Sequence, residues 1–248
     1  MTLFGKLPWA LGPVAHRGLH VASRGIIENT ASAFEAAIAK NYAVECDVQA
    51  ALGDEPVIFH DAGLERLTEG KGRLSLFSHD ALRDVVFRGT SDRIMRLGEF
   101  LELIGGRVPI YLEIKTSGDG APGLTRNIAN VLSTYKGPLA AMSFDPKTVA
   151  HIRRLLPRLP RGTVSMVHTP KDYPELSSVA RFRLTHLLDF PATRPNFVAY
   201  HVNDLPQPSV SALRALGMPV LTWTVRTEEQ RERAKAYADA IIFEELQP

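Results

Sequence analysis

The sequence predicts one α/β domain over residues 1–248, folded as a (β/α)8 barrel of the TIM type. Short apolar runs that are typical of strands alternate with amphipathic runs that are typical of helices along nearly the whole chain, which indicates a parallel sheet. The length of 248 residues suits about eight such strand–helix units in one barrel. An open doubly wound sheet is the second choice, because the segment Gly18-Leu19-His20 after the first strand is not the G-x-G-x-x-G loop that such a sheet favours.

Nine apolar runs predict strands, one more than a closed barrel of eight requires. Val57–His60 is the candidate for the additional strand, because only eight residues separate it from Val48. A gap of this length is too short for a crossover helix, so we expect this run to be a hairpin partner of the preceding strand. The predicted strands are Val14–His16, Ala43–Val48, Val57–His60, Pro109–Ile114, Leu139–Ser143, Thr163–Val167, Asn196–His201, Pro219–Val225 and Ala240–Phe243.

Five segments between these strands carry the signals of helices. Thr30–Lys40 has an apolar face that follows a cap at Asn29 or Thr30. Asp145–Leu156 begins with a capping aspartate and has a proline in its first turn. A capping box opens Thr227–Tyr237. The other two predicted helices are Leu97–Ile104 and Ser209–Leu216, and the latter ends at Gly217.

Two further segments predict irregular structure. Residues 61–96, which follow the second and third strands, combine four glycines with many charges and few periodic signals. We interpret them as an insertion over the functional site, inside the single domain, rather than as a linker. Thr116–Gly123 is rich in glycine and serine and predicts a small loop.

Charge and cysteine content exclude several classes of function. The net charge is +2 and the basic residues are spread along the chain, which argues against nucleic-acid binding. The one cysteine, Cys46, allows neither a disulfide within the chain nor a thiolate zinc site. No run approaches the ~18 apolar residues of a spanning helix, and the first residues make a poor signal peptide, so we expect a cytoplasmic protein.

The N-terminal segment is apolar and is broken by Pro8 and Pro13. We favour the interpretation that it forms a lid packed over the floor of the barrel. The alternative is a weak contact with a membrane surface, although the segment lacks the basic face of an interfacial helix. The apolar side chains concerned are Leu3, Phe4, Leu7, Trp9 and Leu11.

Ionisable residues stand at the ends of several predicted strands. Side chains alternate along a strand, so Glu45 and Asp47 point to one face and Cys46 to the other. Glu113 and Lys115 repeat this arrangement two strands later. Because the carboxyl ends of parallel strands meet at one end of a barrel, we expect these groups to converge on one site.

Three carboxylates inside a barrel repel one another and lose hydration, which costs several kcal/mol for each unmatched ion. A divalent cation offsets this cost, and oxygen ligands favour a hard ion, Mg²⁺ or Ca²⁺, with Mn²⁺ also compatible. We therefore expect Glu45, Asp47 and Glu113 to hold a divalent metal. The alternative interpretation is a set of surface ion pairs at the strand ends.

His16 and His60 are the candidate acid and base, because an imidazole titrates near neutral pH and can accept or donate a proton. Arg17 offers a planar fork suited to a phosphate oxygen, and Lys115 offers a compact charge suited to the transition state. Glu28 precedes a helix that Asn29 can cap, so Glu28 itself is free for another role.

These motifs together resemble the glycerophosphodiester phosphodiesterase family, and the resemblance runs from about Pro13 to Phe243. It implies a TIM-type barrel, a divalent ion and hydrolysis of a small glycerophosphodiester to sn-glycerol 3-phosphate and an alcohol, within lipid and glycerol metabolism. The motifs that carry it are Ala15-His16-Arg17-Gly18, Glu28-Asn29-Thr30 with Ala33-Phe34, Glu45-Cys46-Asp47-Val48, residues 57–61, Leu64-x-Arg66-x-Thr68-x-Gly70-x-Gly72, Leu112-Glu113-Ile114-Lys115 and Trp223-Thr224-Val225.

The resemblance also implies roles for individual residues. The metal ligands would be Glu45, Asp47 and Glu113. The acid and base would be His16 and His60, with Arg17 and Lys115 on the phosphate. Trp223 would line the glycerol side, Phe144 would help to wall the pocket, and Glu28 would contribute to substrate binding. For Trp223, core packing at a strand end is the equal alternative. His201 could reach the pocket from its strand end, but we assign it no chemistry.

The chain departs from the family pattern at several positions. Phe243-Glu244 stands where the family often has Thr-Asp, and Arg226 stands where an asparagine is common. These departures bear on substrate choice and on one rim of the pocket more than on the reaction. The sequence leaves open the head group, the metal, which histidine is the acid, whether water or a glycerol hydroxyl attacks, and the oligomeric state.

Two other functions fit the same residues. One is a lysophospholipase D-type or transphosphorylating lipid phosphodiesterase of the same superfamily, whose end product would be a cyclic phosphate in the transphosphorylating case. The other is a non-catalytic barrel that senses a phosphorylated ligand. Loss of a histidine or a carboxylate would have favoured the sensor, and none is lost here.

Overall fold

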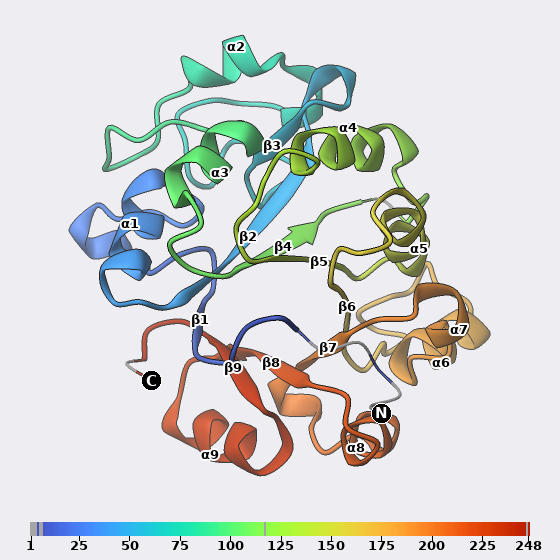
Figure 1. Cartoon of the computed structure of the whole chain (residues 1–248). Helices are drawn as coiled ribbons and strands as arrows, with labels where there is room; N and C mark the ends of the chain where they lie inside the picture. Colours follow the sequence, from blue (N-terminus) through green and yellow to red (C-terminus); the bar gives the residue numbers. More distant parts are fainter. Residues whose placement is uncertain (1–3, 5–6, 117, 247) are drawn as a thin grey trace.

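Eight parallel strands close into a ring in the computed structural model, which describes residues 4, 7–116, 118–246 and 248. The hydrogen-bonded order is β1-β9-β8-β7-β6-β5-β4-β2, and the pairing of β1 with β2 closes it (Figure 1). The predicted (β/α)8 barrel is therefore confirmed. The barrel strands are β1 (Val14–Ala15), β2 (Ala43–Ala50), β4 (Ile110–Ile114), β5 (Leu139–Ser143), β6 (Arg161–Ser165), β7 (Phe197–His201), β8 (Val220–Val225) and β9 (Ala240–Phe243).

The ninth strand, β3 (Pro56–Ile58), lies outside the ring. It pairs antiparallel with the end of β2, with Val48 opposite Ile58. The prediction that the run near Val57 is a hairpin partner is confirmed. This hairpin carries the chain away from the barrel just before His60, and so places that histidine beside the open end of β2.

Helices surround the ring, as Figure 1 shows. They are α1 (Ala31–Ala39), α2 (His79–Arg83), α3 (Leu97–Ile104), α4 (Pro122–Leu132), α5 (Pro146–Leu155), α6 (Ser178–Thr185), α7 (Phe190–Thr193), α8 (Pro208–Ala215) and α9 (Glu228–Tyr237). Short 3-10 segments occur at Ala22–Arg24, Leu52–Asp54, Leu74–Leu76 and Val202–Asp204. Within the described residues, none of the helices is both long and apolar enough to cross a bilayer.

Several boundaries differ from the sequence prediction by one or two residues, and two of the differences have an identifiable cause or consequence. Strand β6 begins at Arg161 rather than Thr163, because Gly162 pairs with Phe197 on β7. A Cβ at Gly162 would lie 2.3 Å from the Phe197 ring, so the glycine that weakens the strand signal is what the close packing requires. Helix α4 begins at Pro122, inside the segment predicted as a loop.

Two apolar layers hold the barrel. Side chains that point inward from the strands form one cluster, in which Tyr111 and Phe197 meet edge to face. Side chains that point outward pack against the helices, and Cys46 lies in that layer with Phe34 and Phe100. The expected alternation along β2 is thus observed, with Cys46 outside and its neighbours Glu45 and Asp47 inside.

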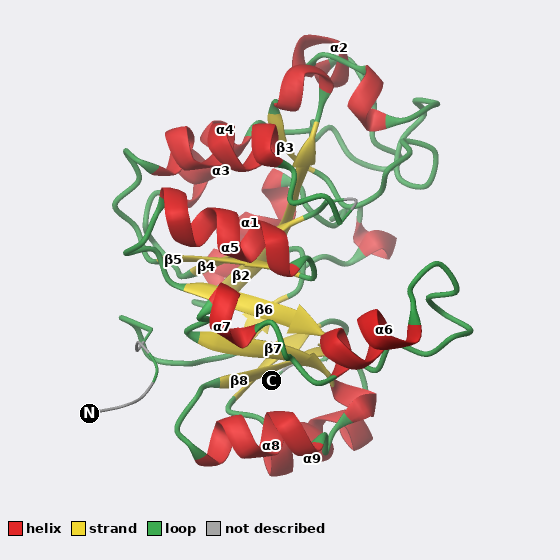
Figure 2. Cartoon of the chain, turned by 90° about the vertical axis from the view of Figure 1, so that its right-hand side faces the viewer, coloured by secondary structure: helices red, strands yellow, loops and turns green. Residues whose placement is uncertain are grey.

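The N-terminal segment packs at the end of the barrel opposite α6 (Figure 2). Leu7, Trp9 and Leu11 pack against the inner cluster, and the Trp9 indole donates a hydrogen bond of 3.1 Å to the Tyr111 hydroxyl. Phe4 is buried in a neighbouring cluster, whereas Leu3 lies outside the described residues. The predicted lid over the barrel floor is confirmed for these described residues.

Residues 61–96 have a small core of their own beside β3. Leu64, Leu74, Leu82 and Phe87 are fully buried there, together with Phe59. The bridges Gly63–Arg73 and Thr68–Phe87, together with backbone hydrogen bonds such as that from Leu64 N to Gly72 O, give the segment structure despite its weak periodicity. The segment meets the barrel's open end through Arg66.

Candidate active site

The predicted site residues come together at the carboxyl end of the barrel. His16 and Arg17 follow β1, Glu45 and Asp47 lie on β2, and Glu113 is on β4. Lys115 follows β4, Phe144 follows β5, and Trp223 lies on β8. All of these except Asp47 line a single cavity of about 270 Å³ together with His60.

The three carboxylates form a compact, buried cluster. Glu45, Asp47 and Glu113 are 1%, 1% and 7% exposed, and each offers an oxygen within 4.8 Å of those of the others. Strand register explains the cluster, because Asp47 on β2 lies directly opposite Glu113 on β4. The expectation that these groups converge inside the barrel is confirmed, and the alternative of surface ion pairs is excluded by their burial.

Burial and charge perturb these carboxyl groups in opposite directions. Burial, reinforced by the charges of Asp47 and Glu113, holds the pKa of Glu45 well above its usual range. Burial also acts to raise the pKa of Asp47, but Lys115 and Arg17 outweigh it and lower that pKa to about 2. The cluster therefore carries charge at Asp47 and resists charge at Glu45.

The cluster has an unused acceptor. Within the described residues, the buried atom Glu45 Oε1 accepts no hydrogen bond, whereas Glu113 Oε1 lies beside the Lys115 ammonium. A buried acceptor without a partner is costly, and three convergent carboxylates suit a hard divalent cation. The donor set therefore fits a metal of the kind expected from the sequence.

Two cations flank the cluster. The Lys115 Nζ atom lies 2.8 Å from Glu113 Oε1 and 3.2 Å from Asp47 Oδ1. The Arg17 Nε atom lies 3.2 Å from Asp47 Oδ2. Although burial opposes it, the surrounding carboxylates raise the pKa of Lys115, so its ammonium is charged at neutral pH.

Local backbone geometry holds Arg17 in place. Gly18 has φ +80°, and a Cβ there would lie 2.8 Å from the Ala33 backbone, so helix α1 approaches this turn as closely as glycine permits. The backbone amide of Asn29 donates to the Arg17 carbonyl, with 2.9 Å between the two atoms. The Arg17 amide in turn donates to Glu45 Oε2 at 3.0 Å.

Both side chains of the Glu28-Asn29 segment contact residues of the site. Of the two capping residues that the sequence offered, Thr30 is the N-cap of α1, and the Asn29 side-chain amide donates to Asp47 Oδ2 at 2.9 Å. Glu28 is not among the residues that line the cavity. Its carboxylate accepts a hydrogen bond from Arg17 at 2.7 Å and further hydrogen bonds from two nitrogens of Arg66. Glu28 therefore fixes the position of the Arg17 guanidinium.

His16 is buried at the edge of the acidic cluster. Its Nε2 atom lies 3.8 Å from Glu45 Oε2, and its Nδ1 atom is paired with Glu244 Oε1. Burial lowers the pKa of His16, and this effect outweighs the opposing influence of Glu244. The imidazole is therefore neutral at neutral pH.

His60 lines the same cavity from the loop after β3. Its Nδ1 atom lies 2.6 Å from Asp61 Oδ1. The Gln49 side chain fixes this loop, because it donates to the carbonyls of Phe59 and Asp61 at 2.8 and 2.7 Å. In each histidine, the Nδ1 atom is thus paired with a carboxylate.

Aromatic rings form one wall. Phe144 and Trp223 meet edge to face with 5.3 Å between ring centroids. His201 lies 5.1 Å from the Trp223 ring, and its Nδ1 atom is 3.1 Å from Asp204 Oδ2. Trp223 therefore lines the cavity and also packs against its neighbours. His201 reaches the cavity as well.

Sequence reasoning missed several residues of the site. Glu244 follows β9 and pairs with His16, and its other oxygen lies 2.7 Å from the Nε atom of Arg226. Met166 and Tyr173 line the cavity from the loop after β6. The available signal was position, because Glu244 directly follows a strand at the end where all the other ionisable groups gather.

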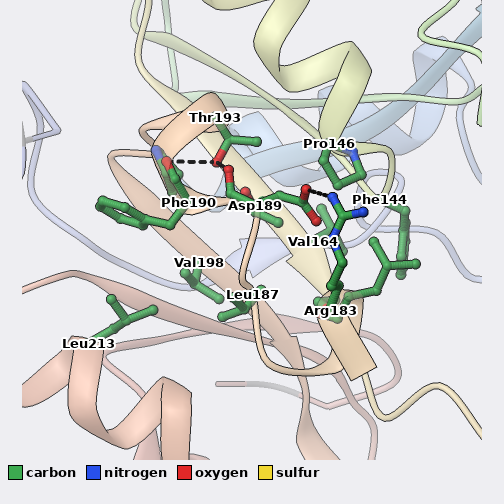
Figure 3. A pocket seen from close by; sticks show the side chains of 14 residues that line it. Phe144, Pro146, Val164, Arg183, Leu187, Asp189, Phe190, Thr193, Val198 and Leu213 are labelled. Carbon is green, nitrogen blue, oxygen red and sulfur yellow. Dashed lines mark hydrogen bonds and ion pairs between the residues drawn. The ribbon is translucent and has the colours of Figure 1, made fainter. Parts of the chain in front are cut away.

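Two larger cavities adjoin the site, and both are lined in part by Lys115. A polar one of about 500 Å³ lies on the His60 side and is lined by Gln49, Asp54, Arg73 and Asp119 among others. A second one of about 640 Å³ lies beside Phe144. A third gap of only about 10 Å³, between β6, β7 and α7, is too small for a substrate and belongs to core packing (Figure 3).

Comparison with known proteins gives the family. The model of the glycerophosphoryl diester phosphodiesterase family matches residues 16–247. The chain belongs to this family. A glycerophosphodiester phosphodiesterase of Caldanaerobacter subterraneus subsp. tengcongensis is 25% identical, over 94% of this chain and 93% of the relative. Glycerophosphodiester phosphodiesterase 1 of Mus musculus is also 25% identical, over 88% of this chain and 72% of the relative.

Solved structures of the family share the fold. An Oleispira antarctica phosphodiesterase in complex with the product sn-glycerol-3-phosphate superposes with a TM-score of 0.77 at 23% identity, over 94% of this chain and 92% of that one. A protein structure from Galdieria sulphuraria gives the same TM-score at 20% identity, over 94% of each chain. At this level of identity the likeness establishes the barrel.

Proposed function

We propose that this member of the glycerophosphoryl diester phosphodiesterase family hydrolyses glycerophosphodiesters to sn-glycerol 3-phosphate and an alcohol with a divalent metal. The observation that carries the proposal is the buried cluster of Glu45, Asp47 and Glu113, flanked by His16 and His60 in one cavity. The relative from Oleispira antarctica holds sn-glycerol 3-phosphate, the product that this reaction would release.

Glu45, Asp47 and Glu113 are the proposed metal ligands. The unpartnered Glu45 Oε1 and the oxygen-only chemistry of the three side chains suit Mg²⁺ or Ca²⁺, with Mn²⁺ also compatible. When bound, the ion supplies a Lewis acid for a phosphate oxygen. The protein's own contribution is to hold the three carboxylates together before substrate arrives, which Asn29 and Lys115 do through Asp47.

Arg17 and Lys115 are proposed to bind the phosphate. A guanidinium matches two phosphate oxygens at once, and an ammonium stabilises charge that develops on a third. Both groups already lie against the carboxylate cluster at 3.2 Å from Asp47, so they need little reorganisation when a phosphodiester enters. Glu28 acts through Arg17 rather than on the substrate.

We assign His16 as the general base. Its pKa is lowered by burial, and the Glu244 carboxylate engages Nδ1, which leaves Nε2 as the acceptor that faces the cavity. His60 is assigned as the general acid that protonates the leaving alcohol. The position of His60 supports this, because it lines both the catalytic cavity and the polar cavity into which a polar alcohol can depart.

Turnover of glycerophosphocholine, followed as sn-glycerol 3-phosphate, tests the proposal. We expect His16→Ala and His60→Ala each to lower kcat by roughly 100-fold or more, as loss of a positioned acid or base does, while thermal stability changes little. EDTA should abolish activity and one of Mg²⁺, Mn²⁺ or Ca²⁺ should restore it. Near-normal activity in both histidine variants would refute the assignment.

The same assay separates the competing functions. A cyclic phosphate as the end product would favour a transphosphorylating enzyme. Tight binding of glycerophosphocholine by calorimetry, with no turnover in any of the three metals, would favour a sensor. Either result would replace the hydrolytic proposal.

A further inference from the structure

Arg66, in the segment 61–96, is not among the residues that line the catalytic cavity or the two cavities that adjoin it. Its guanidinium nevertheless donates four hydrogen bonds to two carboxylates beside the site. Nη1 and Nη2 donate to Glu28 Oε2 and Oε1 at 2.8 and 2.7 Å, while Nε and Nη2 donate to the two oxygens of Asp61. Among the described residues, Arg66 alone forms ion pairs with both of these acids.

Each of the two carboxylates also holds a residue that is proposed to act on the substrate. Glu28 Oε1 accepts a hydrogen bond from Arg17 Nη1 at 2.7 Å. Asp61 Oδ1 lies 2.6 Å from His60 Nδ1. The same two oxygens share the Nη2 atom of Arg66, at 2.7 and 2.9 Å. One nitrogen of Arg66 therefore connects the group proposed to bind the phosphate with the group proposed to protonate the leaving alcohol.

The charge of Arg66 stabilises both carboxylates in their ionised form. Burial acts to raise the pKa of Glu28, but hydrogen bonds from Arg66 and the charge of Arg17 outweigh it and lower that pKa. The pKa of Asp61 is lowered as well, because hydrogen bonds from Arg66 and His60 outweigh the effect of burial. Without the guanidinium, the two negative charges would face and repel each other. We expect each carboxylate then to move, and the residue that it holds to move with it.

The backbone of Arg66 is fixed by the core of the segment 61–96. Leu64 is fully buried in that core, and its carbonyl accepts a hydrogen bond from Thr68 N at 3.1 Å. The Arg88 side chain donates to the Arg66 carbonyl at 3.3 Å. The Arg66 side chain therefore extends from a well-held turn, although 46% of that side chain is exposed.

We propose that Arg66 is a positioning residue that orients Arg17 and His60 together, through the two carboxylates that it binds. This inference rests on the proposed phosphodiesterase activity. A guanidinium suits the role because its rigid fork engages two carboxylates at defined angles, which a lysine ammonium does not. Loss of an outer partner of this kind costs roughly 10- to 100-fold in activity, and we expect kcat/KM of Arg66→Ala on glycerophosphocholine to fall by such a factor.

Two substrates separate the effect on Arg17 from the effect on His60. They are glycerophosphocholine, whose alcohol needs a proton to leave, and the p-nitrophenyl ester of glycerol 3-phosphate, whose phenolate leaves without one. In Arg66→Ala, a displaced Arg17 should raise KM for both substrates. A displaced His60 should lower kcat at least about fivefold more for glycerophosphocholine than for the p-nitrophenyl ester. Equal losses of kcat, or unchanged KM values for both, would overturn the inference.

Double-mutant cycles show whether Arg66 acts through these two residues. Arg66→Ala should cost less kcat on glycerophosphocholine when His60 is already alanine, because the acid is no longer there to be displaced. It should likewise raise KM less when Arg17 is already alanine. Additive losses in either cycle would contradict a joint role for Arg66.

A matched control comes from the same segment. Arg93 is exposed and donates to the neighbouring carbonyls of Ser91 and Asp92, so Arg93→Ala should keep wild-type kinetics on both substrates. If Arg66→Ala does not fold, Arg66→Lys serves instead, since it keeps the charge but not the fork. Arg66→Lys should show the same pattern to a smaller degree, and wild-type kinetics on both substrates would contradict the inference.

The outcomes also separate this inference from the function on which it rests. Wild-type turnover of both substrates, together with an Arg66→Ala variant that matches it, would defeat the Arg66 inference alone. No turnover of either substrate by the wild type, with Mg²⁺, Mn²⁺ or Ca²⁺ supplied in turn, would defeat the phosphodiesterase proposal and this inference with it.

Discussion

Replacing Glu244 by glutamine tests how this chain orients His16. The Glu244 carboxylate is paired with His16 Nδ1 through one oxygen and lies 2.7 Å from Arg226 Nε through the other. Glutamine keeps the shape of the side chain but removes its charge. The imidazole then loses the group that fixes its Nδ1–H tautomer. In part of the molecules Nε2 would carry the proton instead, and it could not accept one from the attacking group.

The magnitude follows from the burial of this pair. The side chains of His16 and Glu244 are only 11% and 9% exposed, so water replaces the lost interaction poorly. A hydrogen bond to a charged group in such a setting contributes about 1.5–3 kcal/mol. If that energy is expressed in the transition state, kcat falls by roughly 10- to 150-fold. KM should change little, because Glu244 does not line the cavity.

The assay is steady-state turnover of glycerophosphocholine, with kcat and KM determined separately. Glu245→Gln is the matched control, since Glu245 is the exposed neighbour, and it should retain wild-type kinetics. Glu244→Asp, which keeps the charge, should recover part of the lost kcat. A Glu244→Gln enzyme with kcat within twofold of wild type, or one in which KM alone changes, would show that His16 does not depend on this carboxylate.

Three further predictions concern the acidic cluster and the turn beside it. In EDTA, Glu45→Gln should raise the midpoint of thermal unfolding, because it relieves charge repulsion among buried carboxylates. The same variant should lose the rise in this midpoint that a divalent metal gives the wild type. The pKa of Asp47 is about 2 in the folded protein, against an ordinary value of 3.8. The Asp47 carboxylate therefore adds about 2 kcal/mol to the free energy of unfolding above pH 4, and this contribution is lost as the pH falls toward 2. Denaturant unfolding of wild type and Asp47→Asn in EDTA should therefore differ more at pH 6 than at pH 2.5, and a constant difference would contradict this. Gly18→Ala should lower stability and kcat together, as the added Cβ would lie 2.8 Å from Ala33, and equal melting curves would show that the turn tolerates it.

The alternation of side chains made the centre of this site predictable. Glu45 and Asp47 are two residues apart on β2, and Glu113 stands at the corresponding height on β4, so a parallel register brings them together. The same reasoning placed Cys46 on the outside. These positions are fixed by backbone geometry that the local sequence determines.

Other features depend on partners that are distant in the chain. The Arg161-Gly162 start of β6 reads poorly as a strand, and only the Phe197 ring on the neighbouring strand explains the glycine. Asn29 looks like a helix cap, yet its amide is directed to Asp47. Local propensity cannot reveal such contacts, because the choice between a local and a distant partner is made by tertiary packing.

Two departures from the family pattern belong together in the structure. Arg226 and Glu244 are two of the positions at which the sequence analysis expected other residues, and their side chains form an ion pair beside His16. The Arg226–Glu244 pair therefore places a carboxylate against His16 and a guanidinium at the rim of the cavity. In the sequence alone, the two residues look like unrelated departures.

The charges of the site favour a phosphodiester over a phosphomonoester. When a divalent cation is bound, Glu45, Asp47 and Glu113 would all be ionised, because carboxylate ligands bind a metal in their deprotonated form. Their three negative charges, the two positive charges of Arg17 and Lys115 and the two of the cation then sum to +1, which a phosphodiester, with its single negative charge, neutralises. A monoester carries nearly two negative charges at pH 7 and would leave an excess in a buried site. The same imbalance arises when the diester is cleaved, so the charge that attracts the substrate also helps to expel sn-glycerol 3-phosphate.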